Sequence, residues 1–437
     1  MNVNLAYGRG QLNLAVPDDA VVYSPHFPEP AGSPSELVMD AVRDAIASTP
    51  LEDAARVAEA GSAVVVVSDI TRPIPYHAFL AGVLAEIESG GIPRGQITVL
   101  IATGMHRPST EAERCEMFGE NVCRDYRIVD HRADAAGDLV TIPGRSRSGR
   151  PIELNRHFVE ADFKVVTGLA EPHFMAGFSG GRKAVCPGLC SLNTVKAFHG
   201  YEFLADPGAR NVNLEGNPLH EESLSIARAA GVDFCLNVVA NGQKEIVGAF
   251  AGDMEASHEA ACRLVRRCAS PAVERECDVV LTSSGGYPLD ATFYQCVKGL
   301  VSCLPAVKTG GAVLAVGACS EGMGSPGYRQ LMYEYAQRPE EFLAAIRERE
   351  DIVKDQWELQ MQVRAMEHAG PENLFFLTDG LPDEDLAHLG MAGIDARGKD
   401  VAVEVQRLLN EVLADGRSLA VIPEGPYCAP EPGSACR

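Results

Sequence analysis

The sequence predicts an α/β fold with two α/β domains, and three observations lead to this prediction. Short apolar runs alternate with segments of helical periodicity along the chain, as in proteins built around parallel sheets. Several of these runs are almost continuous in Val, Ile and Leu, which is typical of strands covered on both faces. At 437 residues the chain is long enough for two or three domains of ordinary size.

The strands and helices follow from local patterns. Strands are expected at 63–67, 97–102, 163–167, 234–239, 279–282, 312–317, 374–378 and 419–423, where runs such as AVVVV and ITVLIA favour extended backbone. A capping box, Ser33-Pro34-Ser35-Glu36, is expected to open a helix that reaches about residue 48. Further helices are expected at 76–88, 255–268, 340–348 and 401–413, because apolar residues there recur three and four positions apart.

The domain boundary is predicted near Ala269-Ser270-Pro271, because a new strand, DVVLTSS, begins soon afterwards. Residues 1–270 then form an N-terminal domain, and residues 275–400 form a second α/β domain. The last helix and strand, within 402–437, are expected to rejoin the first domain.

Composition excludes several classes of partner. The formal charge is −22, from 38 basic and 60 acidic residues, and this sign opposes binding to a phosphate backbone, so no nucleic-acid partner is predicted. An anionic small molecule remains compatible, because a few Arg or Lys side chains can reverse the field inside a cleft. No apolar run approaches the ~18 residues of a membrane-spanning helix, and no membrane partner is predicted.

The cysteines and the N-terminal segment predict a cytoplasmic protein. Thirteen cysteines are scattered along the chain without a C-x-x-C pair, so they are interpreted as reduced, mostly buried thiols. The first residues, MNVNLAYGRGQ, lack the basic and apolar regions of a signal peptide. Disulfides are therefore not expected.

Three predicted strands deliver polar motifs at their carboxyl ends. The strand at 63–67 leads into SDITRP, the strand at 97–102 into TGMHRP, and the strand at 163–167 into GLAEPH. Ligands of open α/β sheets bind beyond the carboxyl ends of the strands. The common placement of these motifs predicts an enzyme active site.

His106 in TGMHRP and His173 in EPHFMAG suit acid–base catalysis, because imidazole titrates near neutral pH. Two opposed bases are what a reaction on both faces of one carbon needs. The alternative is that each is a hydrogen-bonded loop histidine. His199, in the predicted helix SLNTVKAFHGY, is either a packing residue or a metal ligand whose other donors come from an organic cofactor, since one histidine is no metal site by itself.

The turn FSGGRK carries Gly180, Gly181 and Lys183. Glycines allow close approach of backbone to a ligand, and their amides can hold an anion, but the turn also has an ordinary structural interpretation. It is no Walker A loop, because Ala184 follows Lys183. Lys183 is a candidate for covalent attachment if its pKa is depressed.

Two further groups complete the candidate site. Arg72 suits bidentate recognition of a carboxylate or phosphate, and Asp69 in the same loop is placed to orient a partner or Arg72; a surface ion pair is the alternative. Tyr294 and Lys298 are four residues apart on a predicted helix, with Gln295 beside them. They are interpreted either as a face over an anionic substrate or as a solvated helix surface.

These motifs together, SDITRP, TGMHRP, EPHFMAGFSGGRKAVCPG, AFHG, YQCVKG and VIPEGPY, resemble the nickel-dependent lactate racemase family in order along the chain. The resemblance implies two α/β domains with the active site in the cleft between them. It implies a nickel pincer nucleotide, a pyridinium mononucleotide with two sulfur donors and a ring carbon bound to nickel, attached at Lys183. His199 is then the protein's nickel ligand.

The resemblance also assigns the remaining residues. His106 and His173 become the catalytic pair, Asp69, Gly180 and Gly181 border the cofactor, and Arg72, Tyr294, Gln295 and Lys298 contact the substrate. The implied reaction is inversion at C2 of a 2-hydroxy acid by reversible hydride transfer, with cofactor maturation enzymes as partners. Two alternatives stay open: a larger substrate such as malate, an aryl-lactate or a sugar acid, and a nickel-cofactor binding protein without catalysis. A phosphate-binding hydrolase or kinase is disfavoured, because the chain has no Walker A ending and no carboxylate metal cluster.

Overall fold

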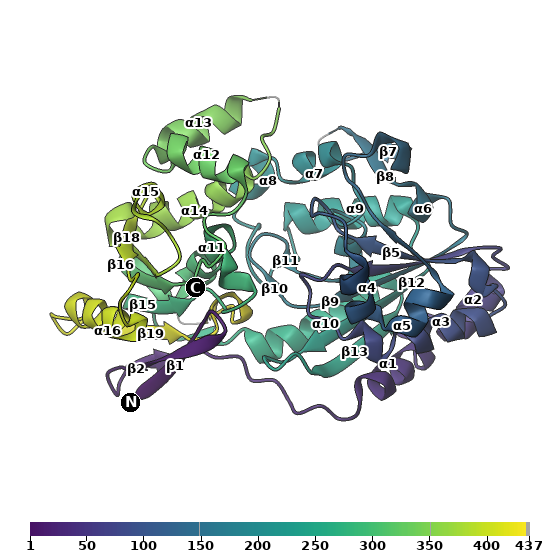
Figure 1. Ribbon diagram of the computed structural model, residues 1–437, viewed down its shortest axis with the longest axis horizontal. Helices are drawn as coiled ribbons and strands as arrows, with labels where there is room; N and C mark the ends of the chain where they lie inside the picture. Colours follow the sequence, from purple (N-terminus) through teal and green to yellow (C-terminus); the bar gives the residue numbers. More distant parts are fainter. Residues whose placement is uncertain (148, 350, 434–437) are drawn as a thin grey trace.

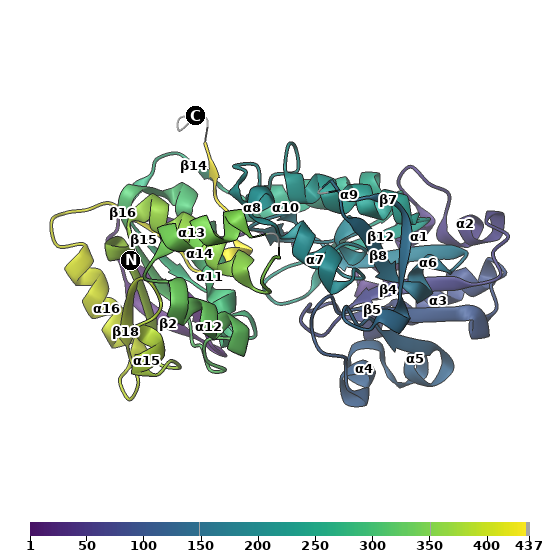
Figure 2. The same ribbon diagram turned by 90° about the horizontal axis from the view of Figure 1, so that it is seen from above.

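Two α/β lobes lie side by side in the computed structural model, which describes residues 1–147, 149–349 and 351–433 (Figure 1). Each lobe is built on a six-stranded sheet. Seen from above, the short helices α7 (Leu192–Phe198) and α8 (Tyr201–Ala205) lie between the two lobes (Figure 2). The predicted α/β class with two domains is confirmed.

The first sheet carries the three strand-end motifs. Its order is β13 (Ile246–Gly252), β12 (Phe234–Ala240), β9 (Phe163–Leu169), β4 (Ala63–Ser68), β5 (Ile97–Ala102) and β6 (Arg127–Asp130). Only the β12–β13 pairing in this sheet is antiparallel. Val65 and Val67 belong to the apolar cluster formed with α1 (Pro34–Arg43), α2 (Leu51–Val57) and α3 (Leu80–Ser89). Val64 and Val66 belong to the cluster on the other face, so β4 is covered on both sides, as its run of valines predicts.

The second sheet is parallel throughout. Its order is β18 (Ala392–Asp395), β17 (Leu374–Thr378), β16 (Val307–Val316), β15 (Cys277–Ser283), β19 (Leu419–Ile422) and β3 (Val21–Val22). Helices α11 (Phe293–Ser302) and α14 (Gln356–Ala369) pack together and against β16. Helix α16 (Val401–Val412) and the hairpin of β1 (Asn2–Tyr7) and β2 (Gly10–Ala15) share an apolar cluster with β15 and β19.

The second sheet corrects the predicted division of the chain. Strand β19 pairs with β15, so the expectation that 402–437 rejoins the first domain is wrong for this strand. Helix α16 is a crossover that returns the chain to the same sheet, and local sequence does not specify which edge of which sheet a parallel strand joins. The N-terminal hairpin and β3 also belong to this lobe, although they were expected in the first.

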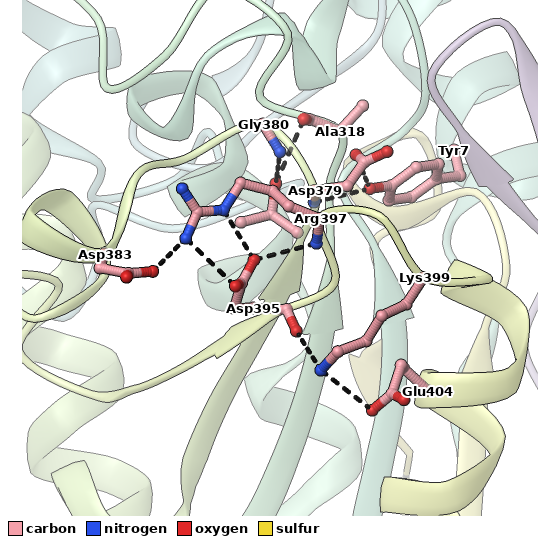
Figure 3. A network of polar contacts seen from close by, with 10 residues as sticks. Tyr7, Ala318, Asp379, Gly380, Asp383, Asp395, Arg397, Lys399 and Glu404 are labelled. Carbon is pink, nitrogen blue, oxygen red and sulfur yellow. Dashed lines mark hydrogen bonds and ion pairs between the residues drawn. The ribbon is translucent and has the colours of Figure 1, made fainter.

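Polar contacts fasten the N-terminal hairpin to the second lobe. The Tyr7 hydroxyl binds the Asp379 carboxylate and accepts from the Asp379 amide at 3.2 Å (Figure 3). The amide of Gly8, at the tip of the hairpin, donates to Oδ2 of buried Asp290 at 2.7 Å. Because Asp290 precedes α11, the hairpin supports the start of the helix that carries Tyr294 and Lys298.

Most predicted elements are present within a few residues of their expected ends. The helix expected at 76–88 begins as a 3₁₀ turn, Tyr76–Ala78, before α3. Elements that were not anticipated include β1, β2, β13, α14 and the hairpin of β7 (Leu139–Arg145) and β8 (Pro151–Asn155). Short 3₁₀ turns lie between the elements. The remaining helices and strands are α4 (Glu111–Phe118), α5 (Glu120–Asp125), α6 (Arg156–Val159), β10 (Pro172–His173), β11 (Gly177–Phe178), α9 (Pro218–Ala230), α10 (Met254–Ala269), β14 (Ala272–Val273), α12 (Pro326–Tyr335), α13 (Pro339–Glu348), α15 (Asp383–Leu386) and β20 (Glu431–Pro432).

Two expectations from composition can be compared with the described residues. Among their helices, none combines the length and apolarity needed to cross a membrane. The twelve described cysteines are free thiols, and ten of them are buried, in agreement with their interpretation as reduced, mostly apolar side chains.

Candidate active site

The strand-end motifs meet because β4 lies between β5 and β9. Strand β4 pairs in parallel with both neighbours, so the loops after the three strands leave the sheet at one edge. Asp69 follows β4, His106 follows β5 and His173 follows β9. Direct contacts between the loops show that the three motifs lie together.

His106 and Asp69 form a hydrogen-bonded pair across two loops. The His106 Nδ1 lies 2.6 Å from Oδ2 of Asp69, and the other oxygen, Oδ1, accepts from the Thr71 amide and hydroxyl. Burial opposes ionisation of Asp69, but the hydrogen bond from His106, the charge of His106 and the hydroxyl of Thr71 together lower the pKa of Asp69. A carboxylate on Nδ1 orients the imidazole and leaves Nε2 with a free lone pair.

His173 is held in the opposite tautomer. It lies on a short hairpin, β10 paired with β11, and its Nδ1 accepts from the amides of Met175 at 3.3 Å and Ala176 at 3.1 Å. The neutral ring therefore carries its proton on Nε2. Burial, followed by the charges of Lys183 and Lys298, lowers the pKa of His173 well below the usual value.

Arg72 is in contact with a residue that the sequence interpretation did not single out. Its Nη1 is ion-paired with Oε1 of Glu171, two residues before His173. Glu171 also faces Ser179, whose hydroxyl lies 3.4 Å from the same oxygen. The signal for Glu171 was its place inside the EPH motif, but nothing in the sequence paired it with the loop after β4.

Lys183 lies at the centre of the site. It follows the glycine turn in a short 3₁₀ segment, Gly181–Ala184, and among the described residues its ammonium group has no hydrogen-bond partner. Burial first, and then the charges of Arg72, Arg182 and Lys298, lower the pKa of Lys183 well below the usual value. A lowered pKa favours the neutral amine, which is the nucleophilic form needed for covalent attachment.

The two glycines of the turn are explained by packing. Both have positive φ, 83° at Gly180 and 53° at Gly181. A Cβ at Gly180 would lie 2.8 Å from the Asn237 side chain, and one at Gly181 would lie 2.7 Å from His258. The Gly181 amide already donates to Asn237 at 2.8 Å, so it is not free to hold an anion. The predicted contact of these glycines with a cofactor stays a prediction.

Behind the turn, Arg182 supports the loop from inside the lobe. Its side chain is 1% exposed and donates to the Ala176 carbonyl at 2.8 Å and to Nε2 of His258 at 2.9 Å. Burial lowers the pKa of Arg182 to about 10, so it stays charged at neutral pH. The sequence analysis did not single out this residue, and the structure gives it a packing role.

His199 ends helix α7 as its C-cap; the sequence interpretation placed it within the helix. Nδ1 lies 2.9 Å from the Val195 carbonyl, so Nδ1 donates and Nε2 keeps a lone pair. Burial lowers the pKa of His199 to about 4, which keeps the ring neutral, as a metal ligand must be. The ring stacks on Trp357 of α14, with 4.6 Å between centroids and an interplanar angle of 30°.

Trp357 connects His199 to the second lobe and was not anticipated. Its indole N–H donates to the Tyr294 hydroxyl at 2.9 Å. It is the only tryptophan of the chain, and this was the one feature of the sequence that could have drawn attention to it. Further along α14, Gln360 donates to the Tyr201 carbonyl at 2.9 Å and Arg364 to the Ala209 carbonyl at 2.6 Å. Helix α14 therefore holds the segment after α7 from the opposite lobe.

Helix α11 brings the other predicted residues to this place. The Lys298 ammonium lies 5.9 Å from the ring centroid of Phe174, next to His173, so the two lobes meet at this helix. Burial lowers the pKa of Lys298 to about 8, with Arg72 acting in the same direction and Glu358 opposing it. The Gln295 Oε1 is buried without a hydrogen-bond partner in the described part of the chain. It is thus available to a ligand.

The donor set of the site agrees with one protein ligand for a metal. Among the described residues, no cluster of three or more His, Cys, Asp or Glu side chains could hold a metal ion. His199, neutral and with Nε2 free, is suited to complete the coordination of a metal that an organic group already binds. Lys183 lies close enough for its charge to lower the pKa of His199 further.

Comparison with known proteins identifies the family. The description "Lactate racemase N-terminal domain" matches residues 7–211, and "Lactate racemase C-terminal domain" matches residues 272–426. The curated lactate racemase of Lactiplantibacillus plantarum is 36% identical over 397 residues, covering 89% of this chain and 91% of that protein. The chain belongs to the lactate racemase family. Members of this family named in these comparisons are racemases, and the chain is accordingly an isomerase.

A second lactate racemase supports the assignment over the whole length. The protein from Thermoanaerobacterium thermosaccharolyticum is 33% identical over 432 residues, covering 97% of this chain and 98% of that protein. The solved structure of its apoprotein superposes with a TM-score of 0.87 at 31% identity, covering 99% of this chain and 100% of that one. A Thermotoga maritima protein, at 18% identity and a TM-score of 0.65 over 87% of this chain and 97% of that one, shares the fold.

Proposed function

We propose that the protein inverts the C2 stereocentre of a 2-hydroxy acid, lactate or a relative of it, with a nickel pincer nucleotide attached at Lys183. The observation that carries the proposal is that the loop after β4 contacts the loops of both His106 and His173. His106 keeps a lone pair on Nε2, His173 carries a proton there, and Lys298 lies 5.9 Å from the ring centroid of Phe174 beside His173. Inversion of a carbon that bears a hydroxyl group needs proton transfer on two faces and a cation for the carboxylate.

The residues present fit such a cofactor. Lys183 is a partly buried amine with a depressed pKa and, in the described part of the chain, no hydrogen-bond partner. His199 offers a neutral Nε2. Lys183 would hold the nucleotide covalently, and His199 would bind the nickel. When bound, this group would supply an acceptor for the hydride of C2. Loss of C2–H as a proton would have a high barrier, because the C2–H of a hydroxy acid is a very weak acid.

The chain itself binds the substrate and moves its proton. Arg72 and Lys298 hold the carboxylate, and Tyr294 and Gln295 border the substrate; among the described residues Oε1 of Gln295 has no hydrogen-bond partner. One of His106 and His173 takes the hydroxyl proton as C2 becomes a planar ketone, and the other returns a proton after the opposite face has been presented. Asp69 stabilises the imidazolium form that His106 takes when it accepts the proton.

The decisive experiment uses protein produced together with the cofactor maturation enzymes and nickel. Enantiopure L- and D-lactate are each supplied, and chiral chromatography follows the formation of the other enantiomer. We expect racemisation of both, one equivalent of nickel, and an added mass on Lys183 in intact-mass spectrometry. If the protein is loaded with nickel but inverts no 2-hydroxy acid, the proposal fails.

Two other functions are separated by the same sample. A larger substrate would show as inversion of malate, an aryl-lactate or a sugar acid without inversion of lactate. A nickel-cofactor binding protein would be loaded but inert toward all of them. The presence of both His106 and His173, each fixed by its own hydrogen bonds, favours catalysis, because storage of a cofactor needs no acid–base pair.

A further inference from the structure

We propose that Glu171 matches the site to substrates with a single carboxylate, because it holds Arg72 by one nitrogen and cancels one positive charge. This inference rests on the proposed function and selects among its substrates. Nothing in the family comparisons assigns a role to Glu171.

The ion pair engages only one of the three guanidinium nitrogens of Arg72. Glu171 contacts Nη1 of Arg72, and in the described part of the chain Nε and Nη2 have no other partner. The Arg72 side chain is 32% exposed and that of Glu171 is 16% exposed. One edge of the guanidinium is therefore fixed by the protein, and the other can receive one carboxylate in a two-point contact.

Ser179 holds Glu171 in place through two contacts. The hydroxyl of Ser179 lies 3.4 Å from Oε1, and the Ser179 amide donates to the Glu171 carbonyl at 2.9 Å. The residue thus joins the loop after β4, the loop after β9 and the glycine turn. An exposed ion pair contributes little, but a pair fixed at both ends orients the guanidinium for a ligand.

The charges around the pair show what Glu171 balances. Three cations approach the substrate region: Arg72, Lys183 and Lys298. Arg182 lies behind the turn, bonded to Ala176 and His258. An amide bond on Lys183 removes its charge, which leaves Arg72 and Lys298.

Three carboxyl groups oppose these cations. Asp69 is engaged with His106, and burial raises the pKa of Glu358 to about 8, which keeps it mostly protonated at neutral pH. Glu171 is the carboxylate that acts on both Lys183 and Lys298. Two cations and one carboxylate leave one positive charge, which one substrate carboxylate neutralises.

A dicarboxylate such as malate therefore meets an unfavourable site. Its second carboxylate would lie near Glu171, with no cation left to pair with it. Two like charges repel strongly in a partly buried site. Replacing Glu171 by Gln removes the negative charge and frees the second edge of Arg72. The change should therefore favour two carboxylates over one.

The test measures binding of L-lactate and L-malate to the cofactor-free protein by isothermal titration calorimetry. The quantity compared is the ratio of the two dissociation constants, so the charge of free Lys183 affects both variants alike. In Glu171→Gln we expect the malate-to-lactate ratio to fall by roughly tenfold relative to the parent protein, the size expected for one charge in a half-buried site. An unchanged ratio overturns the proposal.

Two further variants show whether charge is the cause. Glu171→Asp keeps the charge and should keep the parent ratio, so a shift as large as that of Glu171→Gln overturns the proposal. Glu86→Gln removes a carboxylate from the Arg43–Glu86 ion pair on α3 and should change nothing. Thermal melting checks that each variant is folded.

The binding experiment and the racemisation assay test the role of Glu171 and the proposed reaction separately. If the loaded enzyme racemises nothing but the ratio shifts as expected, the proposed reaction fails and carboxylate selection by Glu171 remains. If the enzyme racemises lactate and the ratio does not move, the role of Glu171 fails and the reaction remains.

Discussion

At the scale of single residues, the two histidines of the site are not equivalent. A carboxylate holds His106 at Nδ1, whereas backbone amides hold His173 at Nδ1. The first contact leaves the lone pair of a neutral ring on Nε2, and the second leaves the proton on Nε2. The sequence predicted that both residues take part, and these contacts give each a distinct starting state.

Replacing Asp69 by Asn tests the pair with His106. The amide cannot stabilise the imidazolium, so we expect kcat of the loaded enzyme to fall by about 10²-fold, within the range of general acid–base catalysis, with a smaller change in KM. Steady-state racemisation measures both constants. Asp53→Asn, which removes a surface carboxylate paired with Arg56, should leave them unchanged. A normal kcat in Asp69→Asn would show that the contact is not catalytic.

The pKa of Lys298 predicts how substrate binding depends on pH. This pKa is lowered to about 8, so the lysine is charged below that pH and loses its charge as the pH rises through it. We expect KM to rise above pH 8, approaching tenfold per unit where deprotonation is complete. Lys298→Arg should move the rise to higher pH, because arginine stays charged. A flat KM between pH 7 and 9.5 would contradict this role.

At the scale of elements, helix α14 determines how the lobes meet. Trp357 stacks on His199, and one and two turns later Gln360 and Arg364 bind carbonyls in the segment 201–209. Periodicity did not predict α14, because polar residues such as Gln356, Glu358 and Gln362 are buried along it. Their partners, for example the Leu389 carbonyl for Gln362, come from distant parts of the chain.

Variants of Trp357 separate its two contacts. Trp357→Phe keeps an aromatic ring against His199 but loses the bond to the Tyr294 hydroxyl, so we expect nickel content near that of the parent and a KM a few-fold higher, as for loss of one hydrogen bond. Trp357→Ala removes the stacking as well and should lower the nickel content. Metal analysis and kinetics of both loaded variants provide the measurements. Equal nickel content in the two variants would exclude a role of the ring in supporting His199.

At the scale of the whole molecule, buried neutral histidines predict acid sensitivity. Burial lowers the pKa of His131 and of His199 to about 4 and that of His220 to about 3. The unfolded chain takes up these protons below pH 6.5, whereas the folded chain does not. The contribution of these neutral histidines to the free energy of unfolding is therefore fully present above pH 6.5 and is lost as the pH falls through 4.

His131 offers a test of this linkage away from the site. It is fully buried, bonded to the Cys190 carbonyl at 2.9 Å and to Asn155 at 3.2 Å. His131→Gln removes one titrating group, so between pH 6.5 and 4 the free energy of unfolding should fall less steeply, by up to about 1.4 kcal/mol per pH unit. Urea denaturation of the cofactor-free protein across this range measures the slope. Identical slopes would mean that His131 titrates normally when folded.

The sequence by itself determined the α/β class, most of the strands, and the three motifs that follow β4, β5 and β9. These features are local: a run such as Val64–Val67 favours a buried strand whatever its neighbours are. The sequence also placed the motif residues together, because each motif follows a strand and parallel strands end at the same edge of a sheet.

Only the tertiary structure decided which distant segments meet. It placed β19 and the N-terminal hairpin in the second sheet, paired Glu171 with Arg72, and set Trp357 against His199. Strand order and contacts between lobes depend on the packing of whole elements, which no local pattern records. The depressed pKa of Lys183 follows from the same cause, because its burial and the nearby charges come from parts of the chain as far apart as Arg72 and Lys298.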